Sequence, residues 1–304
     1  MSEVKVLYTY KENNATTRLA GLTDDCVVAS LPNKNKNKVL FVPKNGGEAI
    51  VSDVFPTSGL FPADAHGDFA VIQQAAPRKL QSSFLLKKDG NIVELDKGSI
   101  SKPNVFASRI DEFGVYGEVR NTTQIVYCHW DLSGKIVVSS NSNYIAGTLN
   151  NVPIMNNLLV DLPSNLGESM ALYVVNGWVI GRAYEKNESG VAKKTTASSV
   201  SWLWNMDNGL KICTMPDGRK LSITTVSVDG RYVVGLAWTN NSPDQQAVLL
   251  DLEKSKYLGL EELAGCSDGG MADWSNAKFD SDGSLYLRRI AVLNGPMEIV
   301  KITI

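Results

Sequence analysis

His66 is one of two histidines in the sequence, and it lies between two carboxylates in the run Asp64-Ala65-His66-Gly67-Asp68. An imidazole beside carboxylates can act as a general base, and together with Asp68 it could bind a cation. The glycine of the run also predicts a surface turn, in which His66 would have no chemical role. The second histidine, His129, precedes Trp130 in an apolar run, which favours packing. Neither histidine is accompanied by a Gly-x-Ser-x-Gly turn, so a serine hydrolase is not expected.

Five aspartates stand at similar positions, each just before an apolar run: Asp25, Asp68, Asp111, Asp229 and Asp282. In one interpretation they converge from separate repeats and bind the metal ion of a hydrolase or lactonase. In the other, each aspartate closes its own turn, because Asp and Gly tolerate the backbone of tight turns. The same turns account for the acidic pairs Asp24-Asp25 and Asp111-Glu112. A glycosidase would need two carboxylates facing each other across a bond, and the sequence brings no particular pair together.

Aromatic side chains suggest a third kind of chemistry, the stacking of sugars. The six tryptophans are Trp130, Trp178, Trp202, Trp204, Trp238 and Trp274. Most of them stand in strand-like runs, where large aromatic side chains fill the space between sheets. Trp274 follows Gly269-Gly270 and is predicted to lie in a loop, which makes it the best candidate for sugar binding.

The cysteines and glycines carry no cofactor motif. Cys26, Cys128, Cys213 and Cys266 are widely spaced, whereas a zinc site needs ligands a few residues apart. We therefore expect reduced thiols that act as small hydrophobic side chains. A Gly-x-x-x-x-Gly-Lys-Ser/Thr phosphate loop is also missing from the sequence, and no cofactor is expected.

The elements that must position these residues are predicted to be strands, because apolar residues alternate with a period of two. The clearest unit starts at Thr225–Ala237, where an Asp-Gly turn leads into a β-branched strand. A second apolar run at Ala247–Leu252 and a third at Tyr257–Leu260 complete a strand, a loop and a hairpin. Such a unit forms one small antiparallel sheet.

Weaker copies of this unit recur along the whole chain. Equivalent positions are Phe41, Leu85, Cys128, Val160, Trp204, Leu250 and Val300, which are 44, 43, 32, 44, 46 and 50 residues apart. This spacing is typical of the four-stranded blades of a β-propeller. We predict an all-β, single-domain protein over residues 1–304, with seven blades, or six if the short unit at Leu158–Leu162 is a partial blade.

The ends of the chain complete the pattern. The last copy, Met297–Ile302, stops after its third strand, while Val4–Tyr10 is a strand without a blade of its own. Pairing the two would supply the missing outer strand and close the ring of blades. We therefore expect the N-terminal strand to join the C-terminal blade.

The turn and strand motifs resemble known propeller repeats. Val226–Val234 and Phe279–Leu287 resemble the S-x-D-G strand-initiating turns of Tol-type and WD-like repeats. Trp178–Gly181, Val200–Trp204 and Tyr257–Leu263 are similar to successive pieces of the HAF-type repeat. The resemblance is good over two blades and fainter over the others. It implies the fold rather than a reaction, because these motifs mark strands and turns.

Composition and charge bound the possible functions. With 43% hydrophobic and 20% charged residues the sequence is that of a globular protein. The net charge of −2 lacks the basic excess of nucleic-acid-binding proteins, so no nucleic-acid partner is expected. No apolar run approaches the roughly 20 residues that span a bilayer. Met1–Val6 does not begin a signal peptide, which predicts a cytoplasmic protein or a particle assembled in the cytoplasm.

These observations favour a non-catalytic structural or protein-interaction module that works with other proteins of a larger assembly. A phage tail or virion component fits this description, because propellers of this kind occur in tail hubs and nozzles. Two alternatives remain open. The first is a metal-assisted hydrolase or lactonase that uses carboxylates such as Asp68 and Asp229, and the second is a carbohydrate-binding propeller that uses Trp274.

Overall fold

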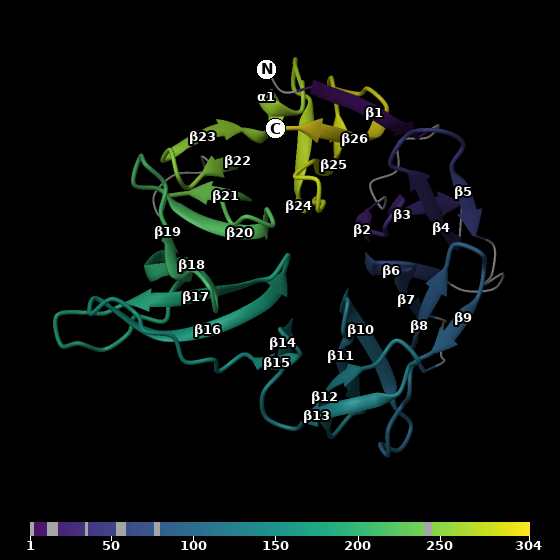
Figure 1. Ribbon diagram of the computed structural model, residues 1–304, viewed down its shortest axis with the longest axis horizontal. Coiled ribbons are helices and arrows are strands. Elements are labelled where there is room, and N and C mark those ends of the chain that lie inside the picture. The colour runs from purple at the N-terminus through teal and green to yellow at the C-terminus, as the bar shows by residue number, and fades with distance from the viewer. Residues whose placement is uncertain (1–2, 11–17, 34–35, 53–58, 76–79, 240–244) are drawn as a thin grey trace. The chain divides into compact units, whose positions relative to one another are not determined.

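The computed structural model of the chain describes residues 3–10, 18–33, 36–52, 59–75, 80–239 and 245–304 (Figure 1). These residues are arranged almost entirely in antiparallel strands, as the alternating sequence predicts. Contacts divide the chain into two compact units, one of residues 6–151 and the other of residues 1–5 with 152–304. Each unit is described separately below.

In the unit of residues 6–151, the described residues form three four-stranded sheets. The first has β2 (Leu19–Leu22), β3 (Cys26–Asn33), β4 (Lys36–Pro43) and β5 (Ile50–Ser52). The second has β6 (Gly59–His66), β7 (Phe69–Ala75), β8 (Ser82–Lys87) and β9 (Ile92–Glu94). The third has β10 (Asn104–Asp111), β11 (Gly114–Arg120), β12 (Ile125–Trp130) and β13 (Ile136–Ser140).

The described part of the unit that ends at residue 304 forms three more four-stranded sheets. The first has β16 (Leu166–Val175), β17 (Trp178–Glu185), β18 (Ser199–Asn205) and β19 (Gly209–Cys213). The next has β20 (Lys220–Val226), β21 (Tyr232–Trp238), β22 (Gln246–Asp251) and β23 (Lys256–Gly259). The last has β24 (Met271–Phe279), β25 (Leu285–Ile290) and β26 (Met297–Thr303), with β1 (Glu3–Thr9) beyond β26. The short helices η1 (Thr196–Ser198) and α1 (Leu260–Leu263) lie in connections between strands.

The position of β1 confirms the predicted role of the N-terminal strand. It is the outer strand of the last sheet, whose order is β1-β26-β25-β24. Val4 packs against the apolar core of that sheet. The backbone edge of β26 is therefore covered, as the closure of a propeller requires.

The described residues form six four-stranded sheets, so the six-blade alternative is the one observed. The short fourth unit is a pair of strands, β14 (Ile145–Leu149) and β15 (Val152–Met155). The strand predicted at Leu158–Leu162 was wrong, because this run is irregular and Leu159 is 93% exposed. Anchor positions Cys128 and Trp204 are consequently 76 residues apart, since 204 minus 128 spans the inserted pair as well as a blade.

The apolar core lies between neighbouring sheets. Middle strands are buried on both faces, and for this reason Cys26–Ala29 and Val233–Val234 read as continuous apolar runs. Ile180 and Leu203 of one sheet pack in a cluster with Val226 of the next. The fourth strands are more exposed, as in β23, where Tyr257 and Leu258 reach solvent.

A β-bulge interrupts the first strand of each of the six sheets, a feature that the sequence does not announce. In β20 it lies between Ile223 and Thr225, and in β16 between Ala171 and Tyr173. A bulge bends its strand and re-aims the following side chain. The Tyr173 hydroxyl accordingly donates to the Ile223 carbonyl oxygen of the neighbouring sheet at 2.5 Å.

Buried serines tie neighbouring sheets together at their third strands. Ser201 of β18 donates its hydroxyl proton to the carbonyl oxygen of Leu221 in β20, at 2.6 Å. Ser83 of β8 makes the same kind of bond to Val105 of β10, at 2.8 Å. In the low dielectric between sheets, these bonds fix the register of one blade against the next.

Candidate functional site

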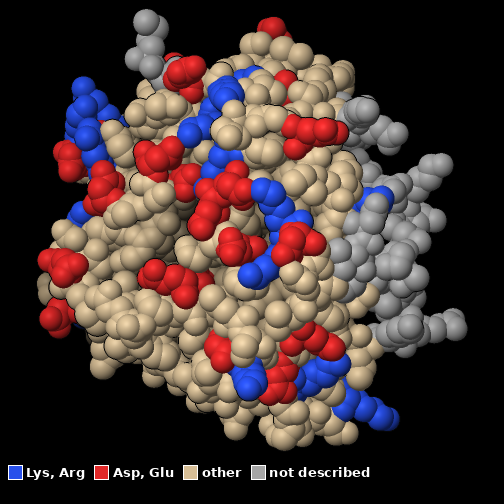
Figure 2. Space-filling view, turned by 45° about the vertical axis from the view of Figure 1, so that its right-hand side comes forward, with Lys and Arg blue, Asp and Glu red and all other residues tan. Residues whose placement is uncertain are grey.

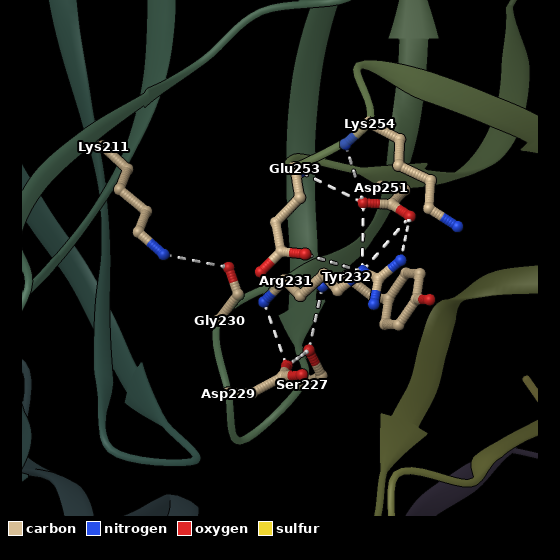
Figure 3. A network of polar contacts seen from close by, with 9 residues as sticks. All are labelled: Lys211, Ser227, Asp229, Gly230, Arg231, Tyr232, Asp251, Glu253 and Lys254. Atoms are coloured by element: carbon tan, nitrogen blue, oxygen red, sulfur yellow. Dashed lines mark hydrogen bonds and ion pairs between the residues drawn. The ribbon is translucent and has the colours of Figure 1, made fainter.

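The turn Ser227-Val228-Asp229-Gly230 carries the candidate Asp229, and it is closed by its own side chains (Figure 3). The Ser227 hydroxyl donates to Asp229 Oδ1 at 2.5 Å and accepts the Tyr232 backbone N–H at 2.9 Å. Asp229 Oδ1 also accepts the Arg231 backbone N–H at 3.0 Å. Both side chains thus satisfy backbone donors that the turn would otherwise leave open.

Electrostatics agree with this role for Asp229. Partial burial would raise the pKa of its carboxyl group, but the bonds from Ser227 and the Arg231 amide, with the Arg231 charge, hold it below the usual value. A carboxylate that is already hydrogen-bonded and ionised is a poor general base at neutral pH. The geometry therefore supports turn closure at Asp229.

Glycine is required at position 230 both by the backbone conformation and by the close approach of Trp178. Its φ is +69°, and a Cβ atom at this position would lie 2.1 Å from the ring of Trp178. Trp178 is 1% exposed, and its indole N–H donates to the Val228 carbonyl oxygen at 3.0 Å. The Lys211 ammonium lies 4.6 Å from the centre of the same ring. The turn therefore packs directly against Trp178 of the neighbouring sheet, which confirms the packing role predicted for this tryptophan.

Arg231 leads out of the turn into an ion-pair network (Figure 3). Its Nη2 donates to Asp251 Oδ2 at 2.8 Å, and its Nε lies 3.4 Å from Glu253 Oε2. The hydrogen bond from Arg231 is the main reason that the pKa of Asp251 falls below its usual value. Asp251 Oδ1 also accepts the backbone N–H of Lys254 at 3.1 Å, so the network joins two turns of one sheet.

The second copy of the motif shows which feature is essential. Asp280 occupies the place of Ser227, and its N–H donates to the Ser284 carbonyl oxygen at 2.9 Å. Asp282 Oδ1 accepts the Ser284 N–H at 2.8 Å, as Asp229 does for Arg231. The aspartate before the glycine is common to both turns, whereas the serine is replaced.

The run around His66 does not bring its three titratable side chains together. His66 and Asp68 are exposed, whereas Asp64 is 8% exposed and accepts the Ile110 N–H of the neighbouring sheet at 3.2 Å. Asp68 faces Lys87 at 3.8 Å. His66 is therefore an exposed residue at the end of β6, directly before the turn rather than within it.

Asp25 and Asp111 also have partners of their own. Asp25 forms an ion pair with Lys88. Asp111 Oδ1 accepts the Phe113 N–H at 2.9 Å and the Tyr116 hydroxyl at 2.8 Å, while burial raises the pKa of Asp111. Within the described ranges, no three His, Cys, Asp or Glu side chains are grouped so that they could hold a metal ion.

Trp274 lies in strand β24, so its prediction as a loop residue was wrong. The bulge of this strand extends from Asp273 to Lys278, which explains why the sequence reads as irregular there. The indole is half-buried and packs against the cluster that contains Leu260 and Phe279. This packing reduces the ring area that a sugar could cover.

Sequence reasoning missed a cavity of about 230 Å³ between the sheets β16–β19 and β20–β23. Its lining residues are Pro163, Asn165, Leu166, Glu185, Ser199, Val200, Ser201, Ile212, Cys213, Thr214, Gly218, Arg219, Lys220 and Leu221. Lys220 Nζ lies 2.5 Å from Glu185 Oε1 on its wall. These two residues are 35 positions apart, and no local pattern in the sequence connects them.

An apolar corner, defined as Met271, Val292 and Leu293, lies where the last sheet begins. These side chains are 59%, 42% and 65% exposed. Met271 begins β24, whereas Val292 and Leu293 lie in the loop after β25. The loop before β24 is joined to that loop by the bond from the Leu293 N–H to the Asp268 carbonyl oxygen at 3.3 Å. Exposed apolar side chains grouped on one corner are typical of surfaces that bind other proteins.

Comparisons with solved structures identify the fold. The β-propeller domain of the Trilobed protease from Pyrococcus furiosus has a TM-score of 0.55 at 8% identity, over 98% of this chain and 94% of that chain. TolB from Acinetobacter baumannii has a TM-score of 0.49 at 11% identity, over 91% of this chain and 63% of TolB. This chain thus spans less than two thirds of TolB. At such identities the likeness concerns the fold alone.

The chain is a β-propeller with four-stranded blades, as its repeats predict. No protein family matches the sequence, and no curated protein matches it either. Among the described residues, no helix has the length and apolar composition needed to cross a membrane.

Proposed function

We propose that this propeller is a non-catalytic protein-interaction module of a larger assembly, such as a phage tail or virion. The apolar corner carries the proposal. Leu293, at 65% exposure, and Met271, at 59%, are large side chains that a free surface would leave in water. Covering them with a partner would remove apolar area from water, which is the main driving force of association.

The Asp-Gly turns support the non-catalytic part of the proposal. Asp229 and Asp282 are engaged in closing their own turns, and Asp68 is exposed beside Lys87. On the face shown in Figure 2, acidic and basic residues are interspersed with broad uncharged areas. Such a surface suits contact with proteins better than tracking of phosphates.

The test is size-exclusion chromatography with light scattering of native material, for the natural sequence and for Leu293→Asp. We expect the natural chain to elute in a fixed ratio with partner proteins and the variant to elute as a 33.1 kDa monomer. Val191→Asp is the matched control, because Val191 is 59% exposed but lies in the loop between β17 and β18. A natural chain that elutes as a monomer without partners would refute the proposal.

A further inference from the structure

We infer that the cavity between β16–β19 and β20–β23 receives one aromatic side chain of a partner polypeptide. This inference rests on the proposed function, since it takes the chain to bind other proteins. The cavity would be a second point of contact with the partner, separate from the apolar corner. The inference also specifies the chemistry of the partner residue that fills the cavity.

The lining of the cavity calls for an apolar occupant. Leu166, Val200 and Leu221 are buried side chains that line it, at 4%, 9% and 5% exposure. Two serine hydroxyls line it as well, but each donates its proton to the protein. Ser199 bonds the Thr196 carbonyl oxygen at 2.7 Å, and Ser201 bonds that of Leu221 at 2.6 Å. Because both protons are already used, these hydroxyls could only accept hydrogen bonds from a sugar and could not donate to it, whereas a hydrocarbon group needs neither.

The size of the cavity fits one ring. A volume of about 230 Å³ exceeds the roughly 150 Å³ of an engineered protein cavity that binds benzene. It is below the roughly 300–1,000 Å³ of pockets that enclose a whole drug-sized ligand. One side chain, rather than a complete small molecule, matches this space.

The charges on the wall favour an aromatic ring over an aliphatic chain. Lys220 contributes an ammonium group and Arg219 a guanidinium group. Arg219 already lies over an aromatic ring, with its Cζ 5.1 Å from the centre of Tyr257. Glu185 and Asp217 neutralise the two cations, at 2.5 Å from Lys220 and 2.8 Å from Arg219. A neutral ring gains attraction from a cation without adding a charge, and an aliphatic group does not.

The neighbouring thiol does not compete with this use of the cavity. Cys213 is 2% exposed, and burial raises the pKa of its thiol to about 12. The thiol is therefore protonated at neutral pH and acts as a small apolar part of the lining.

The experiment titrates the full chain with N-acetyl-phenylalaninamide and, separately, with N-acetyl-leucinamide, while methyl NMR signals are recorded. We expect saturable shifts of the methyl groups of Leu166, Val200, Ile212 and Leu221, with affinity in the ~millimolar range for such small probes. Lys220→Met keeps the aliphatic stem and should weaken binding of the phenylalanine probe about two- to fivefold, without affecting the leucine probe.

Two variants make the result decisive. Lys254→Met removes an ammonium outside the cavity and should change neither affinity. Thr214→Trp places an indole at an exposed lining position, and it should abolish the shifts while the fold, seen in the remaining spectrum, is retained.

The inference is overturned if those four methyl groups show no saturable shift, if both probes bind equally well, or if Thr214→Trp binds as before. The titration contains no partner protein, so a negative result would overturn this inference without refuting the proposed function. The proposed function is tested separately by Leu293→Asp. If the probes bind as expected but the native chain proves to be a monomer without partners, the polypeptide origin of the ring is refuted.

Discussion

Gly230→Ala should destabilise the protein far more than the same change at Gly283, although both glycines close Asp-Gly turns. Both residues have positive φ, +69° at Gly230 and +81° at Gly283. Alanine in this region costs about 1–2 kcal/mol relative to glycine at either position. At Gly283 no atom lies within 4 Å of the added Cβ, so the backbone term is the whole effect.

At Gly230 the Cβ would lie 2.1 Å from Cζ2 and 2.4 Å from Cε2 of Trp178. The indole would have to move within a tightly packed core, which costs about 1–3 kcal/mol. Moving it also weakens the indole N–H bond to Val228, worth about 0.5–1.5 kcal/mol. The total loss at Gly230 is therefore about 3–6 kcal/mol, or roughly 2–4 kcal/mol more than at Gly283.

Thermal unfolding of the two variants, followed by circular dichroism, measures this difference. We expect the midpoint of Gly230→Ala to lie roughly 4–8 °C below that of Gly283→Ala. Trp178→Leu in the Gly230→Ala background tests the cause, because the two substitutions should then be strongly non-additive. Equal midpoints for the two glycine variants would refute the argument that close packing of Trp178 against the turn requires glycine at position 230.

Other substitutions test the contacts between and within sheets. Ser201→Ala removes the bond to Leu221 and leaves its carbonyl oxygen without this donor, so the free energy of unfolding in urea should fall by about 1–3 kcal/mol. The pKa of Asp251 is lowered by Arg231, so its ionised form stabilises the folded state above roughly pH 4, and this contribution is lost as the pH falls further. Asp251→Asn should therefore be less stable than the natural chain at pH 7, and the difference should shrink below pH ~4; a constant difference would contradict the assigned pair. Deleting Glu3–Thr9 should lower the unfolding temperature, because it uncovers the edge of β26, and an unchanged temperature would argue against closure by β1.

Much of the fold could be predicted from the sequence because a propeller blade is built from local signals. Alternation of apolar residues sets the strands, and Asp-Gly or Asn-Gly pairs set the turns between them. Turn closure by Asp229 is a case in point, since all the groups involved lie within six residues, from Ser227 to Tyr232. The bulge of β24 was missed because a bulge breaks alternation in the way a loop does, and Trp274 was misplaced as a result.

The candidate site depended on contacts that no local pattern encodes. Lys220 and Glu185 meet on the wall of one cavity because two sheets pack side by side, although each residue reads as an ordinary surface charge. The same holds for the apolar corner, where Met271 begins β24 and Leu293 follows β25, at the same end of this strand pair.

The sequence by itself determined the all-β class, the four-stranded repeat and the pairing of the N-terminal strand with the last blade. The class and the repeat follow from backbone preferences of residues close together in the chain. The pairing follows from the strand pattern, because a strand without a blade at one end of the chain matches a blade that lacks its outer strand at the other. Tertiary structure decided that the fourth unit is a two-stranded pair rather than a blade. It also decided that Gly230 must accommodate Trp178 and that a cavity opens beside Lys220. These features arise from the close packing of one sheet against another. The side chains that meet there come from two sheets, so the sequence of either sheet alone does not specify the contact.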